Sequence, residues 1–386
     1  MQQKFGFYTA AWCVADNWNI NLDGNKTASE LAMRNSVPFE ILGKSALENG
    51  SSSQITIVML EGYKYLSKDY IDELEKLNFR MINYEEKFRE IVSLFPNIDK
   101  KYNVFERNCF LRWLAFKDLA QKDHVSHFLH IDSDMVLYSS LEEIAKETEN
   151  KTFMLEGCPA FTSISDFNWF NIYETEINKF EKDISKYSDE ATEAKKLLPE
   201  NNLEICNTAV WRNPLGSDQD LLEYLVSTEK ISQNKSEEIF NSKFFFIQNP
   251  LLIKYWAEKQ GVMTREKMTE KDGQIFYGTK RIPFTHYQGT FCYYANIFII
   301  AHEFFPFNLF GLEKYLYYKI DKTKFRLPKI AIYLWKVAKI FGWRMDRTEF
   351  VKFMEKRNSN GQKRITIVLN FIASSEKNLF IIEKEN

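Results

Sequence analysis

The sequence predicts an α/β fold with a mostly parallel central sheet and flanking helices. Three observations lead to this expectation. Short segments rich in β-branched and aromatic residues recur through the first half of the chain, segments with helical spacing separate them, and 386 residues are enough to bury a large core. A β-α-β-α-β order is typical of nucleotide-binding half-domains, in which ligands collect at the carboxyl ends of the strands.

The first half of the chain is expected to contain four strands. They are short, apolar and bounded by polar or Gly/Ser-rich segments. These strands are expected at residues 4–12, 54–60, 79–84 and 127–138. Helices are expected between them at residues 25–35, 66–78 and 102–123. Thr27 or Asn25 would cap the first of these helices, and Ser67 would cap the second.

The second half of the chain carries fewer strand signals. Strands are expected at residues 152–158, 203–213 and 363–372, with a late edge element at residues 281–289. The polar stretch between the first two strands has helical character, and it is interpreted as an insertion at about residues 163–202 over one face of the sheet. The pattern changes near residue 304. We therefore predict a main domain at residues 1–303 and a C-terminal extension at residues 304–386.

The composition is that of a soluble globular protein, with 45% hydrophobic and 27% charged residues. The net charge of −2 hides an asymmetry, because residues 314–386 hold 17 Lys and Arg against 7 Asp and Glu, a net +10, whereas the preceding residues are at −12. This basic, aromatic extension predicts an anionic partner. In one interpretation, residues 314–347 dock on an anionic membrane surface. In the other, the extension packs as helices in a lid or a dimer surface.

Several classes of protein are disfavoured. The acidic body would repel nucleic acid, and the chain has no recognised nucleic-acid-binding motif. The five cysteines are scattered without a CxxC pair, which argues against a zinc site or a disulfide framework and favours a reducing compartment. The sequence has neither a signal-peptide pattern nor an apolar window of about 18 residues. A cytoplasmic protein is expected, at the inner face of the membrane if the extension docks there.

The segment HFLHIDSDMVLY, at residues 127–138, places Asp132 and Asp134 in a strongly apolar strand. A buried carboxylate needs a cation, a hydrogen-bond network or solvent. Alternate residues of a strand point to the same side, so the two carboxylates are expected to act together. Oxygen ligands of this kind suit Mg²⁺ or Mn²⁺. The alternative is a solvated surface turn or a helix cap, which the apolar neighbours disfavour.

Further residues bear on a metal and phosphate site. His286 precedes a polar segment that ends at Gly289, so an imidazole ligand lies close in sequence to a glycine that lets a backbone N–H approach a phosphate. The helix before the Asp-Ser-Asp segment carries Arg107 and Arg112, whose guanidinium groups suit phosphate. Arg112 is favoured, because it sits among apolar residues and is expected to be partly buried. The alternative is that each is an ordinary solvated or core residue.

In this order, the apolar strand, the D-x-D, the N-T-A of CNTAVW and the H-x-x-G resemble the nucleotide-sugar-dependent glycosyltransferases of the Rossmann-like GT-A fold. The pattern is most similar to family 8, that of glycogenin and bacterial lipopolysaccharide galactosyltransferases, and it covers about residues 4–290. The resemblance implies that Asp132, Asp134 and His286 bind Mn²⁺ (or Mg²⁺). It implies a catalytic set of Asp132, Asp134, Arg112 and Asn207. The implied contacts to the donor, expected to be a UDP-sugar, come from Arg112, Tyr8, Thr9, Ala10, Ser133, Thr208 and Gly289.

The reaction implied is transfer of the donor's sugar to a glycan or lipid-linked acceptor in surface polysaccharide or glycoconjugate synthesis. The metal would stabilise charge on the leaving diphosphate, and Arg112 would add a second positive contact. The family usually has a lysine after its late histidine to meet the diphosphate, and HYQGTFCYY has none. An inverting enzyme would also need a carboxylate base. The candidates for that base near expected strand ends are Glu156, Asp166, Glu204 and Asp218.

Two other functions fit part of the pattern. Haloacid-dehalogenase-type phosphatases also carry D-x-D-x-[TV] after an apolar strand, which would make Asp132 the nucleophile and Asp134 the acid/base. That motif normally begins its domain, whereas about 130 residues precede it here. The non-enzyme alternative is an inactive GT-A scaffold that serves only as a binding protein. The intact Asp132, Asp134 and His286 disfavour it.

Overall fold

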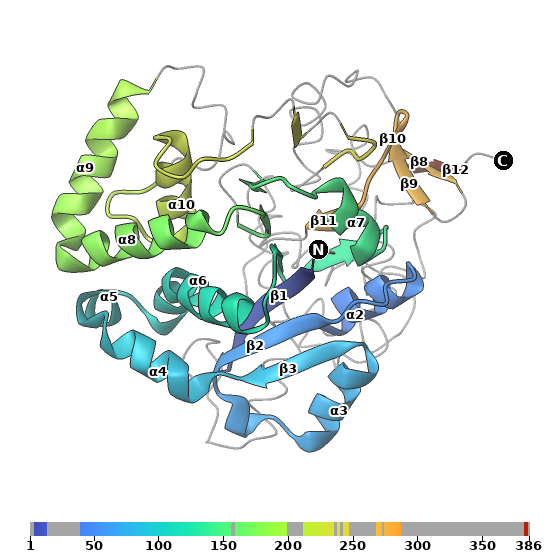
Figure 1. The fold of residues 1–386 in the computed structure, drawn as a ribbon, viewed down its shortest axis with the longest axis horizontal. Helices are drawn as coiled ribbons and strands as arrows, with labels where there is room; N and C mark the ends of the chain where they lie inside the picture. The colour runs from blue at the N-terminus through green and yellow to red at the C-terminus, as the bar shows by residue number, and fades with distance from the viewer. Residues whose placement is uncertain are drawn as a thin grey trace, which may run out of the picture. The chain divides into compact units, whose positions relative to one another are not determined.

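The structure, a computed structural model, describes residues 4–13, 39–155, 159–198, 211–234, 238–239, 242–246, 268–271, 274–286 and 382–384 (Figure 1). The chain divides into two compact units. The first comprises residues 1–135 and 139–242, and the second comprises residues 136–138 and 243–386. Each unit contains a sheet of its own.

The first unit is built on a six-stranded mixed sheet with the strand order β3-β2-β1-β4-β7-β6. The strands are β1 (Phe5–Trp12), β2 (Ile55–Glu61), β3 (Phe79–Asn83), β4 (His127–Ile131), β6 (Phe153–Met154) and β7 (Phe161–Ile164). Strand β1 pairs in parallel with β2 and β4, and β2 pairs in parallel with β3. Strand β7 runs antiparallel to β4 and β6. The expected α/β architecture with a mostly parallel sheet is therefore confirmed.

Helices flank this sheet (Figure 1). They are α2 (Phe39–Glu48), α3 (Lys68–Lys76), α4 (Glu85–Ser93), α5 (Pro96–Lys101), α6 (Val104–Lys122), α7 (Leu141–Glu147), α8 (Asn168–Lys182), α9 (Ile184–Leu197) and α10 (Asp218–Ser227), with a short 3₁₀ turn η2 (Tyr63–Tyr65). Side-chain caps explain where several begin. Ser67 accepts from the Tyr70 N–H at the start of α3, as predicted, and Asn103 accepts from the Glu106 N–H at the start of α6.

Helix α6 lies in the middle of the core. It contacts β1 and β2 on one side and α8 and α10 on the others. Six consecutive residues, Asn108–Trp113, are buried, so this part of the helix is enclosed on all sides and has no solvent-exposed face. Aromatic rings fill the space around it: Trp113 lies 5.0 Å from Trp169 and 5.6 Å from Phe116, measured between ring centroids. This enclosure brings polar α6 side chains into the interior.

Residues 127–138 form two strands, not the single strand that was expected. Strand β4 ends at Ile131, and β5 (Met135–Leu137) begins after a turn at residues 132–134. The reason is that the two halves pair with different neighbours: β4 belongs to the six-stranded sheet, whereas β5 pairs with β11 (Phe284–His286). The Asp-Ser-Asp segment is the turn that allows this change of partner.

Some expected strands were wrong in part. The antiparallel strands of the mostly parallel sheet are β7 and β6, and the connection between these two is too short for a crossover helix. Within the described residues 152–155 of the strand expected at 152–158, β6 covers Phe153 and Met154, and residues 211–213 are not in a strand. Helices α8 and α9 occupy the stretch interpreted as an insertion. Helices α4 and α5 fall in a polar stretch to which no element had been assigned.

The second unit contains a two-stranded ladder and a four-stranded sheet. The ladder joins β5 to β11, and just beyond the ends of these strands the Tyr138 N–H donates to the Pro283 carbonyl at 2.8 Å. The four-stranded sheet has the order β10-β9-β8-β12, with β8 (Met268–Lys271), β9 (Gln274–Tyr277), β10 (Lys280–Arg281) and β12 (Ile382–Lys384). Strands β10 and β11 supply the late element expected at residues 281–289, as far as residue 286.

Several expectations lie outside the described residues. These are the helix at 25–35, the strand at 363–372, residues 203–210 of the expected strand at 203–213, and the extension at 304–386 apart from β12. The boundaries of the predicted domains and the membrane-docking role of residues 314–347 stay predictions.

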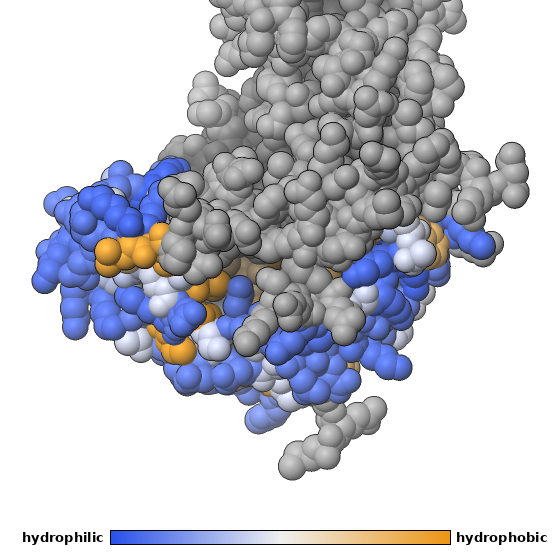
Figure 2. All heavy atoms as spheres, turned by 90° about the horizontal axis from the view of Figure 1, so that it is seen from above, coloured by the Kyte–Doolittle hydropathy of each residue, from blue (hydrophilic) through white to orange (hydrophobic). Residues whose placement is uncertain are grey.

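The described surface in Figure 2 is mostly hydrophilic, with small hydrophobic patches between polar side chains. Large apolar side chains that are exposed in the described residues include Leu94, Phe105 and Leu197. Within the same residues, the structure contains no helix with the length and apolar character needed to cross a membrane.

Candidate functional site

The Asp-Ser-Asp turn lies at the carboxyl end of β4. All five β4 residues are buried, and the Asp132 N–H donates to the Ala160 carbonyl at 2.8 Å, which anchors the turn to the start of β7. Asp132, Ser133 and Asp134 are half-buried, which leaves them less exposed than in a fully solvated surface turn. Ligands of parallel α/β sheets collect at this edge. The position predicted for the two carboxylates is therefore the one that they occupy.

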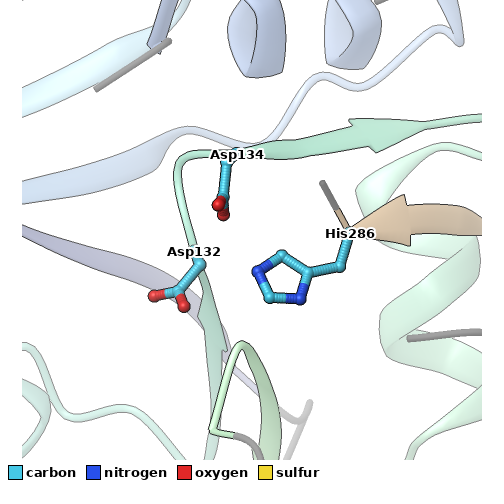
Figure 3. A group of neighbouring side chains, drawn as sticks. All are labelled: Asp132, Asp134 and His286. Atoms are coloured by element: carbon cyan, nitrogen blue, oxygen red, sulfur yellow. The ribbon is translucent and has the colours of Figure 1, made fainter. Parts of the chain in front are cut away.

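Asp132, Asp134 and His286 form a group that could hold a metal ion. One candidate ligand atom from each residue lies within 4.8 Å of the other two. Figure 3 shows both carboxylates at the turn and the His286 imidazole at the end of β11 pointing toward them. Asp134 directly precedes β5, and His286 is the last residue of β11, the strand that pairs with β5. Two carboxylates and an imidazole suit Mn²⁺ or a similar divalent cation.

Arg112 is the most enclosed cation in this part of the molecule. Its Nη1 donates to Asp132 Oδ1 at 3.2 Å, and its Nε donates to Asp218 Oδ2 at 2.9 Å. Burial would lower the pKa of Arg112, but the carboxylates of Asp218 and Asp132 outweigh burial and raise it, so the guanidinium keeps its charge. The burial expected for Arg112 is confirmed. Arg107, the alternative, donates to Glu61 and Asp99 instead.

His130 is a member of the site that the sequence analysis missed. It is fully buried, with Nδ1 3.0 Å from the Tyr8 carbonyl and Nε2 2.9 Å from Asp132 Oδ1. The two partners, a carbonyl and a carboxylate, both accept, so a neutral imidazole donates to one of them, and only a charged imidazolium donates to both. Burial and the Arg112 charge lower the pKa of His130, and the hydrogen bond with Asp132 opposes them. The signal was the spacing, because residues two apart in a strand face the same side.

Asp218 was expected near a strand end as one of four candidate bases, and its position was predicted wrongly. It is the first residue of α10 and is buried. Its Oδ2 accepts from Arg112 and, at 3.0 Å, from Trp113 Nε1. Burial raises the pKa of Asp218, and Arg112 and Trp113 offset part of this rise. A carboxylate enclosed by its own partners in this way is poorly placed to meet an acceptor hydroxyl.

The other predicted site residues are placed unevenly. Asp166 accepts from the Asn168 N–H at the start of α8, so it supports a helix start. Tyr8 and Thr9 are buried in β1, and the Tyr8 hydroxyl donates to Asp123, beside the amino-terminal end of β4. The Tyr8 carbonyl contacts His130, which in turn contacts Asp132. Outside the described residues lie Glu156, Glu204, Asn207, Thr208 and Gly289.

Comparison of the chain with models of protein families and with curated proteins found no match.

Proposed function

We propose that this chain is a metal-dependent glycosyltransferase of the GT-A fold that moves a sugar from a nucleotide-diphosphate donor, expected to be a UDP-sugar, to a glycan or lipid-linked acceptor. The observation that carries the proposal is the pair of half-buried carboxylates, Asp132 and Asp134, at the carboxyl end of a central parallel strand. A buried arginine contacts the first carboxylate, and His286 supplies a third candidate ligand.

The residues that would hold the metal are Asp132, Asp134 and His286. A divalent cation bound there would stabilise the negative charge that develops on a leaving nucleotide diphosphate. Protein sites of this kind usually bind the metal through few side chains and leave positions for substrate phosphates. Two carboxylates and one imidazole therefore fit a metal that is shared with a phosphorylated substrate.

Two buried side chains, Arg112 and His130, surround Asp132 and would set its charge environment and orientation. Arg112 is a fixed cation beside Asp132, and its partners hold it in place before any substrate arrives. Preorganised charge in a dry environment stabilises charge better than mobile charge in water does. His130 holds the same Asp132 oxygen from the β4 side. The carboxylate is thus oriented from two directions, which is how residues around a metal ligand usually set its geometry.

Nucleotide binding tests the proposal. The melting temperature of the purified chain would be measured with UDP, GDP, CDP or ADP, each in Mn²⁺ or in EDTA. A ligand at 100 times its Kd adds about 2.7 kcal/mol to the free energy of unfolding. We therefore expect one nucleotide to raise the melting temperature by several degrees in Mn²⁺ and not in EDTA.

Two variants make this test specific. Asp134→Ala should abolish the Mn²⁺-dependent rise, because one of the carboxylate ligands is lost. Asp69→Ala, which removes an exposed carboxylate from the first turn of α3, should keep it. Absence of stabilisation by every nucleotide would refute the proposal. Release of phosphate from phosphomonoesters in that case would favour the phosphatase.

A further inference from the structure

One guanidinium joins Asp218 to Asp132. Two nitrogens of Arg112, Nε and Nη2, lie 2.9 and 2.8 Å from Asp218 Oδ2. The third nitrogen, Nη1, lies 3.2 Å from Asp132 Oδ1. A guanidinium is planar, so fixing two of its nitrogens on one carboxylate fixes the direction of the third. Asp218 therefore determines where Nη1 points.

The Asp218 end of this link is held rigidly. The side chains of Asp218 and Arg112 are 4% and 7% exposed, so little of either is in contact with water. Trp113 Nε1 donates to the same Asp218 oxygen at 3.0 Å, and its ring packs against Trp169. Asp218 also lies in the first turn of α10, where the helix dipole stabilises a negative charge.

The residue on the other side of Arg112 is Asp132, a candidate metal ligand. Arg112 Nη1 donates to Asp132 Oδ1, and His130 Nε2 lies 2.9 Å from the same oxygen. Groups that hydrogen-bond to a ligating carboxylate fix its orientation, and their loss typically weakens metal binding by about 10- to 100-fold. The Arg112 charge itself would oppose a divalent cation nearby. The charge of Asp218 offsets that repulsion.

We propose that Asp218 is a positioning residue for the divalent-cation site. It holds Arg112 so that the guanidinium orients Asp132, and it neutralises the charge that would otherwise compete with the cation for this carboxylate. The inference rests on the proposed function to the extent that Asp132 is a metal ligand. Asp218 acts through Arg112 and does not touch the cation.

The test is Mn²⁺ affinity, measured on the full chain without nucleotide from the electron paramagnetic resonance signal of free Mn²⁺. Asp218→Asn keeps the shape and an oxygen that accepts from Arg112 and Trp113, but it removes the charge. We expect this variant to bind Mn²⁺ about tenfold more weakly than the wild type.

Asp220→Asn is the matched control. Asp220 is a buried carboxylate of the same helix turn, and it accepts from Arg212 Nε at 2.8 Å and from the Gly216 N–H at 2.7 Å. The charge change and the helix are the same in both variants, so a general loss of stability would affect both. We expect Asp220→Asn to keep the wild-type Mn²⁺ affinity within about twofold.

Arg112→Lys keeps the test decisive if Asp218→Asn does not fold. An ammonium retains the charge but lacks the planar fork that bridges two carboxylates, so about a tenfold loss of affinity is expected again. If Asp218→Asn and Arg112→Lys fold and bind Mn²⁺ as tightly as the wild type, the inference is overturned and the proposed function is unaffected. Equal losses in Asp218→Asn and Asp220→Asn would overturn it too. Absence of Mn²⁺ binding by the wild type would overturn both proposals.

Discussion

Glu223 is a buried acid whose burial is only partly offset by nearby hydrogen-bond donors or positive charge. It lies on α10 and is 4% exposed. Within the described part of the chain, its Oε2 has no hydrogen-bond partner. Burial raises the pKa of Glu223 from 4.5 to about 9, the charge of Asp220 adds to this rise, and Lys195 opposes it. Glu223 therefore keeps its proton at neutral pH in the folded protein and loses it in the unfolded chain.

The sign of the pH dependence follows from these values. The folded pKa lies above the unfolded one, so the contribution of Glu223 to stability is fully present below pH 4.5 and is lost as the pH rises toward 9. Each pH unit between the two values costs about 1.4 kcal/mol. Between pH 4.5 and pH 7, the free energy of unfolding should therefore fall by about 3 kcal/mol through this residue alone.

Glu223→Gln tests this magnitude, because glutamine is similar in shape and does not titrate. Urea unfolding of the variant and the wild type would be followed by circular dichroism from pH 5 to pH 8. We expect near-equal stability at pH 5 and a variant that is more stable by about 3 kcal/mol near pH 7. The control is Glu193→Gln, since the Glu193 side chain is 69% exposed on α9. Parallel pH curves for Glu223→Gln and the wild type would refute the reasoning.

Two further predictions concern local structure. Asn103→Ala should lower the free energy of unfolding by about 1 kcal/mol, because it removes the side chain that accepts from the Glu106 N–H at the start of α6. Asn103→Ser should retain most of this stability, since serine is also a good N-cap. Equal melting temperatures for the wild type and both variants would contradict this prediction. Gly62→Ala should destabilise the protein far more than Gly50→Ala in urea unfolding. Both glycines have positive φ, but only at Gly62 would a Cβ meet the Cys13 carbonyl, so similar losses would show that the clash is absent.

Much of the first unit could be predicted from local patterns. Strands β1, β2 and β3 and helices α3 and α6 begin and end within a few residues of the predicted bounds. Their signals are alternation, helical spacing and caps, each of which acts over a few neighbouring residues. The place of Asp132 at the carboxyl end of β4 follows from the same information. The sequence by itself thus determined the layers of the sheet and the edge at which the candidate site lies.

Only the tertiary structure decided which side chains surround Asp132. The turn that separates β4 from β5 depends on pairing with β11, about 150 residues later in the chain. The pair of Arg112 and Asp218 joins positions 106 residues apart, through the packing of α10 against α6. Such partners leave no local periodicity in the sequence, because a buried charge selects whichever carboxylate the fold brings to it. Burial and long-range packing therefore set the electrostatics of the site.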